Sequence, residues 1–249
     1  MSEALYPTGG LRFWSEREIL LREQFVARLF LAVRDPLTAL NPAWQFRRVE
    51  GPVVTPRPRI SPEYADADLW TLGRPVGTES AALRAETTAS SYLYAHALLQ
   101  RGDAKLPLCV WQHGKSFRAE SNDGATPSQL RFNEFYQLEF QCAFKTDSKA
   151  DYLAAVLPAV AAEIGRAAGL ATRVVPSDRL PSYSRSTTDV ECHWKAHDWK
   201  EAASVSLRTD FPVPGVTVLE VAVGTDRLVC FESREFSPDW PPAPAGVPA

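Results

Sequence analysis

The sequence has no apolar run near the roughly 18 residues of a membrane span, and its first ten residues hold no basic stretch followed by an apolar one. It also has no marked excess of one charge, because 27 Lys and Arg residues stand against 30 Asp and Glu residues. Such a balance gives no general attraction to nucleic acid or to anionic membranes. These absences predict a cytoplasmic protein with no membrane partner.

Cysteine is scarce as well, with four residues that lie far apart in strand-like contexts: Cys109, Cys142, Cys192 and Cys230. This spacing favours buried, reduced thiols over a disulfide framework. The 45% hydrophobic composition supports one large domain or two small ones. Internal repeats are absent, and the one biased segment is the proline-rich run at 236–249. Because proline removes backbone donors, we expect a disordered tail there, after an ordered region at 1–235.

Hydrophobic periodicity predicts helices at 15–34, 86–102, 148–171 and 225–232. Ser15 and Glu18 form the pattern of a capping box at the first helix, and Gly102 is placed to end the second. Strand-like runs lie at 44–60, 106–120, 131–144, 186–194, 200–211 and 217–223. Most of these strands follow one another without a helix between them. The pattern favours an α+β fold with a mainly antiparallel sheet flanked by helices.

The strand predicted at 131–144 has one polar face. Since side chains alternate along a strand, this face carries Arg131, Asn133, Phe135, Gln137, Glu139 and Gln141. Such a face cannot pack against apolar side chains without leaving donors and acceptors unpaired, so it either meets water or forms a site. A charged surface strand shows the same alternation, but the aromatic ring in its middle favours a site.

Arg118 and Glu120 share one face of the preceding strand, at 106–120. Together with Phe135 they suit a nucleotide base and its phosphates. The ring can stack on the base, an arginine can neutralise phosphate, and a glutamate can accept a hydrogen bond from an exocyclic amine.

Several segments resemble class II aminoacyl-tRNA synthetases. The run FRAE (117–120), followed by a loop and RFNEFYQLEF (131–140), closely resembles motif 2 of that family. LEVAVGTDRLVCF (219–231) resembles motif 3, in which a strand leads through G-x-D-R into a helix. The first helix with VEGPVVTPR (49–57) resembles motif 1, the family's dimer element. Two further stretches resemble the glycyl branch, the second with seryl-like features: LRAETTASSY at 83–92, and STTDVE with DWKEAASVSLRTDF at 186–191 and 198–211.

The resemblance covers about residues 15–235. It implies a class II catalytic domain at 1–235, closest to glycyl-tRNA synthetase, without an anticodon-binding domain. It also implies a homodimer formed through motif 1, and a need for ATP and Mg²⁺.

The resemblance implies that seven residues bind ATP: Arg118, Glu120, Arg131, Phe135, Glu201, Ser204 and Arg227. In this assignment Arg118 grips the α-phosphate and the amino-acid carboxylate, Glu120 reads the adenine amino group, and Phe135 stacks on adenine. Arg227 holds the γ-phosphate, and Glu201 holds Mg²⁺ on the phosphates. Arg118, Arg227 and Glu201 are the implied catalytic residues. Catalysis then rests on positioning and charge neutralisation.

The resemblance places the amino acid among Glu86, Gln137, Glu139, Glu220 and Ala222. Carboxylates hold the substrate ammonium, and the small residues around them imply a cramped pocket. Glycine is favoured, with alanine and serine possible, because Ala222 stands where glycyl enzymes usually have serine. Some family members bind zinc in this pocket, but Thr88 and Gln141 occupy the matching positions. Neither is a good zinc ligand, so no zinc is expected.

Three functions remain open from the sequence. The first is a minimal glycyl-like synthetase that charges tRNA. The second is an amino-acid ligase that transfers to a carrier protein or a small-molecule amine, and the third is a non-catalytic paralogue. The loop of motif 2 has no lysine or arginine between Arg118 and Arg131, which weakens tRNA as the acceptor because phosphate contacts need basic residues.

Overall fold

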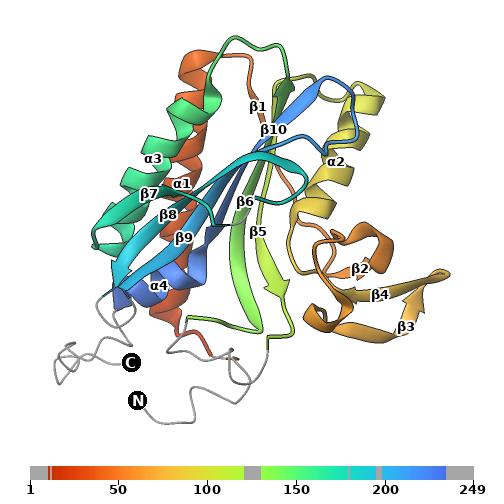
Figure 1. Cartoon of the computed structure of the whole chain (residues 1–249), viewed down its shortest axis with the longest axis horizontal. Helices are drawn as coiled ribbons and strands as arrows, with labels where there is room; N and C mark the ends of the chain where they lie inside the picture. Colours follow the sequence, from red (N-terminus) through yellow and green to blue (C-terminus); the bar gives the residue numbers. More distant parts are fainter. Residues whose placement is uncertain (1–10, 12, 121–129, 179, 195–197, 234–249) are drawn as a thin grey trace.

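The computed structural model describes residues 11, 13–120, 130–178, 180–194 and 198–233; the proline-rich run at 236–249 lies outside this range. Seven strands form the main sheet: β1 (Gln45–Arg48), β5 (Leu108–Phe117), β6 (Glu134–Lys145), β7 (Thr172–Pro176), β8 (Ser184–Trp194), β9 (Asp198–Arg208) and β10 (Val216–Gly224). Their order is β1-β5-β6-β10-β9-β8-β7 (Figure 1). Every neighbouring pair is antiparallel except β1 with β5. The predicted α+β fold is confirmed, with one parallel edge strand.

A second, three-stranded sheet has the order β2-β4-β3, with β2 at Val54–Pro56, β3 at Thr71–Val76 and β4 at Glu79–Leu83. The sequence predicts a short strand within 44–60 that prolines end; the structure has such a strand, β1, but also a second one, β2, that the sequence does not predict. The chain leaves the main sheet after β1 and enters the small sheet at β2, with the Gly51-Pro52 dipeptide between them. Pro56 and Pro75 both lie in edge strands, where a missing N–H costs no central ladder bond.

Four α-helices flank the main sheet: α1 (Glu16–Leu40), α2 (Thr88–Arg101), α3 (Tyr152–Ala168) and α4 (Thr225–Ser233). α1, α3 and α4 cover one face, and α2 packs on the other (Figure 1). The predicted capping box is confirmed, because Ser15 and Glu18 each accept a hydrogen bond from the other's backbone. Gly102 ends α2 with a φ of 76°, a left-handed conformation that glycine adopts without a Cβ clash. No helix in the described ranges is long and apolar enough to cross a membrane.

The main core lies between the sheet and the face of α1, α3 and α4. Leu138 and Phe140 on β6, Leu219 and Val221 on β10, and Phe25 on α1 all belong to it and are at most 1% exposed. All four cysteines are buried and free of disulfides, as predicted. Because these apolar residues fill one face, the alternate residues of β6 and β10 must point to the other face, where no helix covers the centre of the sheet.

Candidate active site

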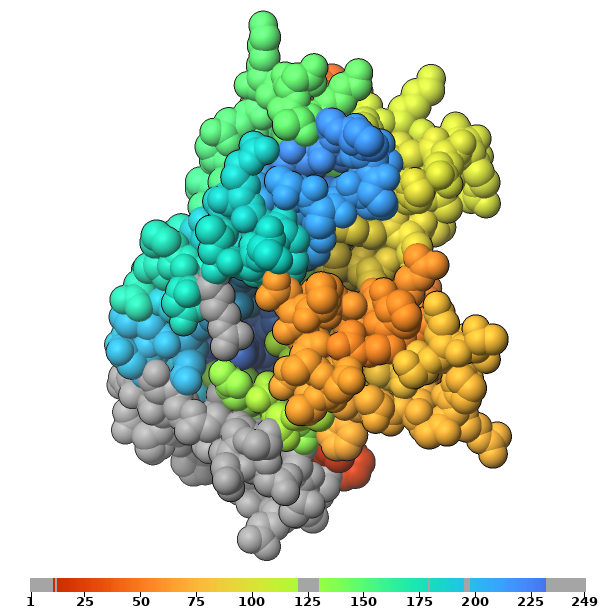
Figure 2. All heavy atoms as spheres, turned by 45° about the vertical axis from the view of Figure 1, so that its right-hand side comes forward, coloured from red at the N-terminus to blue at the C-terminus, as the bar shows by residue number. Residues whose placement is uncertain are grey.

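A cavity of about 200 Å³ opens on that second face, between the main sheet and the connecting segments that carry Tyr64, Glu86 and Tyr183. Figure 2 shows the surface hollowed between orange residues that follow β2 and teal residues that precede β8, with deep-blue C-terminal residues at the bottom. All twelve residues that the sequence nominates for ATP or amino acid line this one cavity: Glu86, Arg118, Glu120, Arg131, Phe135, Gln137, Glu139, Glu201, Ser204, Glu220, Ala222 and Arg227.

Strand register explains why residues far apart in sequence meet here. Glu139 on β6 pairs with Ala222 on β10, which pairs with Ser204 on β9. These three side chains form a row across the sheet on its cavity face. Glu220 lies one step along the same face, opposite Gln141 of β6. The row is central in the sheet, so its backbone is held on both sides by ladder hydrogen bonds.

Of the predicted polar row, Arg131, Phe135, Gln137 and Glu139 line the cavity, whereas Asn133 does not. β6 begins at Glu134, and β5 ends at Phe117, so Arg118, Glu120 and Arg131 lie just past the ends of the hairpin strands. Asn133 does not face the cavity as predicted. Its buried side chain accepts a hydrogen bond from the backbone N–H of Glu120 at 2.9 Å, which fixes the chain where the ladder stops.

A β-bulge brings two consecutive residues of β9 into the cavity wall. Val190 of β8 pairs with Ala203, but Glu191 pairs with Glu201, so Ala202 is the extra residue. Strict alternation would turn either Glu201 or Ala202 away. Instead both line the cavity, and the side chain of Glu201 stays 49% exposed.

Two arginines place positive charge at the outer end of the cavity. Arg118 donates to the Tyr64 hydroxyl at 3.1 Å and to the Ala85 carbonyl at 3.4 Å, and its guanidinium lies 5.2 Å from the ring centroid of Phe135. Arg227 donates to the carbonyl of Glu201 at 2.7 Å, while the Glu201 carboxylate is 3.8 Å away. Both guanidinium groups are thus held mainly by neutral acceptors, and their charge remains available to an anion.

The start of α4, which carries Arg227, is anchored to α1. Buried Asp226 accepts from Arg22 at 2.8 Å and from the backbone N–H of Tyr136 at 2.8 Å. The Arg22 guanidinium also lies 3.9 Å from the Tyr136 ring centroid. These contacts connect α1, β6 and α4, so the helix start is held against the sheet beside the cavity.

The inner end of the cavity is acidic. Glu139 accepts from the backbone N–H and hydroxyl of Thr87 at 3.2 and 2.6 Å and from the Thr88 hydroxyl at 3.2 Å. Burial, followed by the charges of Glu220 and Glu86, raises the pKa of Glu139 to about 7. Burial, and then Glu220, also raises the pKa of Glu86. Carboxyl groups kept in such an environment gain from a bound cation.

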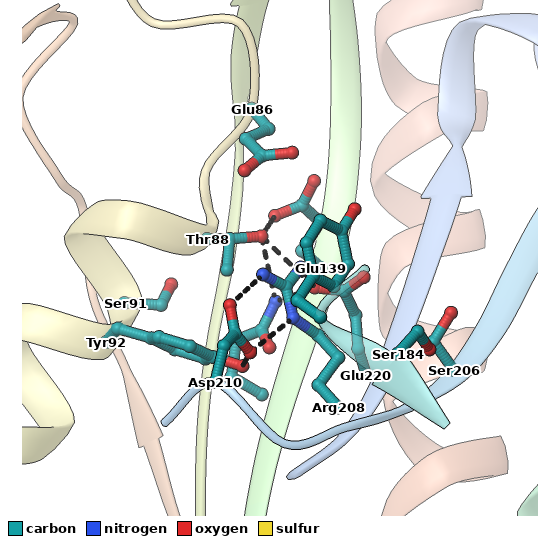
Figure 3. Close-up of polar contacts among 12 residues, drawn as sticks. Glu86, Thr88, Ser91, Tyr92, Glu139, Ser184, Ser206, Arg208, Asp210 and Glu220 are labelled. Atoms are coloured by element: carbon teal, nitrogen blue, oxygen red, sulfur yellow. Dashed lines mark hydrogen bonds and ion pairs between the residues drawn. The ribbon is translucent and has the colours of Figure 1, made fainter. Parts of the chain in front are cut away.

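Arg208 forms an ion pair with the third carboxylate, that of Glu220. It donates to Glu220 Oε2 at 2.7 Å and to both oxygens of Asp210, at 3.1 and 2.7 Å (Figure 3). Gln141 also donates to Glu220 Oε2, at 2.7 Å, and the Thr88 hydroxyl, which has one proton, lies within hydrogen-bond distance of both Glu220, at 3.1 Å, and Glu139, at 3.2 Å. Since these contacts converge on one oxygen, Glu220 is fixed in place.

No family model matches the chain. Over 133 residues it is 31% identical to the glycine–tRNA ligase of Cutibacterium acnes, a stretch that covers 52% of this chain and 28% of the ligase. Its structure is similar to that of Giardia lamblia prolyl-tRNA synthetase in complex with prolyl-adenylate, with a TM-score of 0.68 and 16% identity over 91% of this chain and 48% of that one. It is also similar to Cryptosporidium parvum prolyl-tRNA synthetase complexed with halofuginone and AMPPNP, with a TM-score of 0.70 and 13% identity over 91% and 49% of the two chains.

The chain has the fold of the class II aminoacyl-tRNA synthetase catalytic core. It spans less than a third of the ligase and about half of each synthetase, so the activities of the whole enzymes belong to proposals for this chain. Within this class II core, the hairpin β5–β6 corresponds to the motif 2 resemblance, and β10 with α4 to motif 3.

A buried acceptor of the cavity wall has no protein partner among the described residues. Oε1 of Gln137 is buried, and no hydrogen bond to it is formed within the described part of the chain. Gln137 lines the cavity beside Glu139. Because a buried polar atom is costly to leave unpaired, this oxygen fits a ligand that brings a donor, such as an ammonium group.

The positions at which zinc-binding relatives carry ligands have a different role in this class II core. The Thr88 hydroxyl and the Gln141 amide both donate to Glu220, and Gln141 also donates to Thr88 at 3.2 Å. Among the described residues, no three or more His, Cys, Asp or Glu side chains gather as a metal site. The carboxylate of Glu201 is half-exposed on the cavity wall, and carboxylate oxygens are ligands of the kind that Mg²⁺ takes in proteins.

The sequence reasoning does not nominate Tyr64 and Tyr183, which line the cavity, or Arg208, which lies outside the lining and holds Glu220. Tyr64 and Tyr183 come from loops without periodicity or motif, so nothing in the sequence marks them. Arg208 has a weak signal, since it lies in the run LRTDF that resembles glycyl enzymes. The structure gives it a role, because its guanidinium stacks 3.9 Å from the ring centroid of Tyr183 while it holds Glu220.

Replacing Glu139 by glutamine is expected to flatten the pH dependence of stability. The pKa of Glu139 is raised from 4.5 to about 7 on folding, so the folded state binds this proton more tightly than the unfolded chain does. The stability that the group contributes is therefore full below the unfolded pKa and is lost as the pH rises through about 7. The loss is at most about 3 kcal/mol.

Urea unfolding of both proteins, in buffers on either side of that range, measures the effect. The free energy of unfolding should change less with pH in Glu139→Gln than in the wild type. Superimposable pH profiles would show that Glu139 ionises as easily in the folded protein as in the unfolded chain.

Proposed function

We propose that this protein activates a small amino acid with ATP to form an aminoacyl-adenylate. The observation that carries the proposal is one cavity with two available guanidinium groups at its outer end and carboxylates at its inner end. An α-amino acid has the opposite polarity, with a carboxylate to meet Arg118 and an ammonium to meet Glu86 and Glu139. The class II core fold and the ATP analogue and adenylate named for its structural neighbours support the same reaction.

In the proposed reaction an oxygen of the amino-acid carboxylate attacks the α-phosphorus of ATP. A new P–O bond forms, the bond from the α-phosphorus to the bridging oxygen breaks, and pyrophosphate leaves with the electron pair. Arg118 neutralises charge at the α-phosphate and Arg227 at the γ-phosphate, with Arg131 near the triphosphate. Phe135 and Glu120 hold adenine. Little proton transfer is needed, so the rate depends on alignment and charge neutralisation.

Glu201 is the residue that would hold Mg²⁺, with Ser204 beside it on the same strand. Its carboxylate fits this role because it is half-exposed on the cavity wall and 3.8 Å from its nearest cation, Arg227. When bound, Mg²⁺ neutralises phosphate charge.

Glycine is the favoured amino acid, with alanine and serine as alternatives. Ser204 and Ala222 form the floor between the carboxylates, and their side chains are small. Glu86, Gln137, Glu139 and Glu220 supply oxygen acceptors for an ammonium group. The partial likeness to a glycine–tRNA ligase points the same way. A pocket that excludes larger side chains only by size discriminates weakly between glycine and alanine, because one methylene changes the binding free energy by only about 1–3 kcal/mol.

The acceptor of the activated amino acid is proposed to be tRNA, as in the enzymes that the chain resembles. One observation favours a second candidate, a carrier protein or a small-molecule amine. The sequence from 119 to 130, which joins the two strands of the motif 2 hairpin, contains no lysine or arginine to contact tRNA phosphates.

The proposal is tested by ATP–pyrophosphate exchange with glycine, alanine and serine assayed in parallel. Exchange with glycine above the other two is the expected result. Acylation of tRNA is then compared with acylation of a carrier thiol or an amine to identify the acceptor. Absence of exchange with every small amino acid would leave the non-catalytic paralogue as the remaining interpretation.

A homodimer formed through α1 and the segment 49–57 is also proposed. Apolar side chains are exposed on both parts: Leu20 is 51% and Leu31 42% exposed on α1, and Val53 is 36% and Val54 40% exposed at the start of β2. Light scattering at micromolar concentration is expected to give twice the chain mass of 27.6 kDa. Val54→Glu should shift the mass toward the monomer, and a wild type that measures as a monomer contradicts the dimer.

A further inference from the structure

Tyr64 lies in a loop that hydrogen bonds hold in place on two sides. Arg57 holds the loop from within, because its Nε donates to Asp66 at 2.6 Å and its Nη2 donates to the Tyr64 carbonyl at 2.8 Å. From the other side, the backbone N–H of Ala119 donates to the carbonyl of Asp68 at 2.9 Å. The loop is therefore fixed to the chain that leaves β5, and the side chain of Tyr64 lines the cavity.

The hydroxyl of Tyr64 connects the two groups to which opposite ends of the amino acid are proposed to bind. It accepts from Nη2 of Arg118 at 3.1 Å and donates to Oε2 of Glu86 at 3.2 Å. Burial raises the pKa of this phenol well above its usual range, so the hydroxyl keeps its proton and can donate. The Arg118 guanidinium also lies 5.5 Å from the Tyr64 ring centroid.

We propose that Tyr64 is a positioning residue that makes the site select compounds with both an ammonium and a carboxylate group over acids that lack the amine. The inference rests on the proposed amino-acid activation and assigns it a determinant of substrate class. The phenol oxygen acts as a spacer between a buried cation and a buried anion. It leaves Arg118 open to a carboxylate and Glu86 open to an ammonium group.

Without the hydroxyl, Arg118 and Glu86 lose the group that lies between them and is hydrogen-bonded to both. Opposite charges in a cavity shielded from water attract strongly, so the two side chains are expected to pair directly. A direct pair engages both substrate-binding groups at once. An amino acid and an acid without the amine both then lose Arg118 as a partner for the carboxylate, but only the amino acid also loses Glu86 as a partner for its ammonium.

The test is Tyr64→Phe, which keeps the ring and its contact with Arg118. Exchange is measured with the amino acid that the wild type activates best and with the matching 2-hydroxy acid. The variant is expected to raise the KM for the amino acid about tenfold, as for loss of a hydrogen bond to a charged group, and to change the KM for ATP less than about threefold. The preference for the amino acid over the hydroxy acid should fall about tenfold.

Tyr92→Phe is the matched control. It also removes a phenol hydroxyl, one that donates to Asp210 at 3.1 Å and lies outside the cavity lining, and the preference should stay within about twofold of the wild type. The preference is a ratio, so a smaller folded fraction of Tyr64→Phe does not alter it. An unchanged preference in Tyr64→Phe overturns the inference alone. A wild type without exchange overturns the proposed function and this inference with it.

Discussion

Arg118→Ala is expected to lower ATP–pyrophosphate exchange by about 10²–10³-fold, with the fold intact. Arg118 sits between the ring of Phe135 and the acidic end of the cavity, held by the Tyr64 hydroxyl and a backbone carbonyl. Burial lowers the pKa of Arg118, but Tyr64 and then the carboxylates of Glu86, Glu139 and Glu201 outweigh it and raise the pKa, so the guanidinium stays charged. Alanine removes the cation that faces the proposed α-phosphate, where negative charge must be neutralised as the bond forms.

Arg101→Ala is the matched control for this variant. Arg101 ends α2, pairs only with Asp103 at 3.0 Å, and has a 64% exposed side chain. Its loss should leave exchange unchanged and lower stability by less than about 1 kcal/mol. Circular dichroism and thermal unfolding verify that Arg118→Ala is folded. Exchange that persists in both Arg118→Ala and Arg227→Ala would show that neither arginine binds the phosphates.

Arg208→Met should lower the free energy of unfolding by about 3–5 kcal/mol. The side chain of Arg208 is 3% exposed, and it is the cation that faces the 10% exposed carboxylate of Glu220 at 2.7 Å. Methionine keeps most of the length of the side chain and its packing between Tyr92 and Tyr183, but it leaves Glu220 charged and buried. Urea denaturation at neutral pH measures the loss.

A second substitution separates the charge effect from packing. Glu220→Gln in the Arg208→Met background removes the uncompensated charge, while the amide oxygen can still accept from Thr88 and Gln141. The double variant is expected to recover about half of the lost stability or more. If the double variant is no more stable than Arg208→Met, the loss comes from packing and not from the buried charge.

Local patterns predict most of the elements of the main sheet and its helices. The capping box at Ser15, the αL glycine at 102 and the alternation along β6 and β10 depend on residues within a few positions of each other. Such signals survive in the sequence because the physical cause is itself local. Strand β3 gives no such signal, since all six of its residues are exposed and alternation has no buried face to reveal.

The alternation of side chains along a single strand also predicts which residues face the cavity, but only where the strand is regular. Gln137, Glu139 and Glu220 face it as alternation requires. Glu201 and Ala202 both line it because of a bulge between β8 and β9, and Asn133 turns away because β6 begins one residue after it. Bulges and strand ends depend on the partner strand, so a single strand's sequence does not reveal them.

The sequence by itself determined the polar and apolar faces, the helix ends and the set of charged residues that a nucleotide and an amino acid would need. These features follow from local geometry and from the chemistry of each side chain. Only the tertiary structure decided how those charges are paired. It paired Glu220 with Arg208, placed the Tyr64 hydroxyl between Arg118 and Glu86, and left the side-chain oxygen of Gln137 without a protein partner among the described residues. These pairings join residues 12, 22 and 54 positions apart in different segments, and their distances exist only once the segments have packed together.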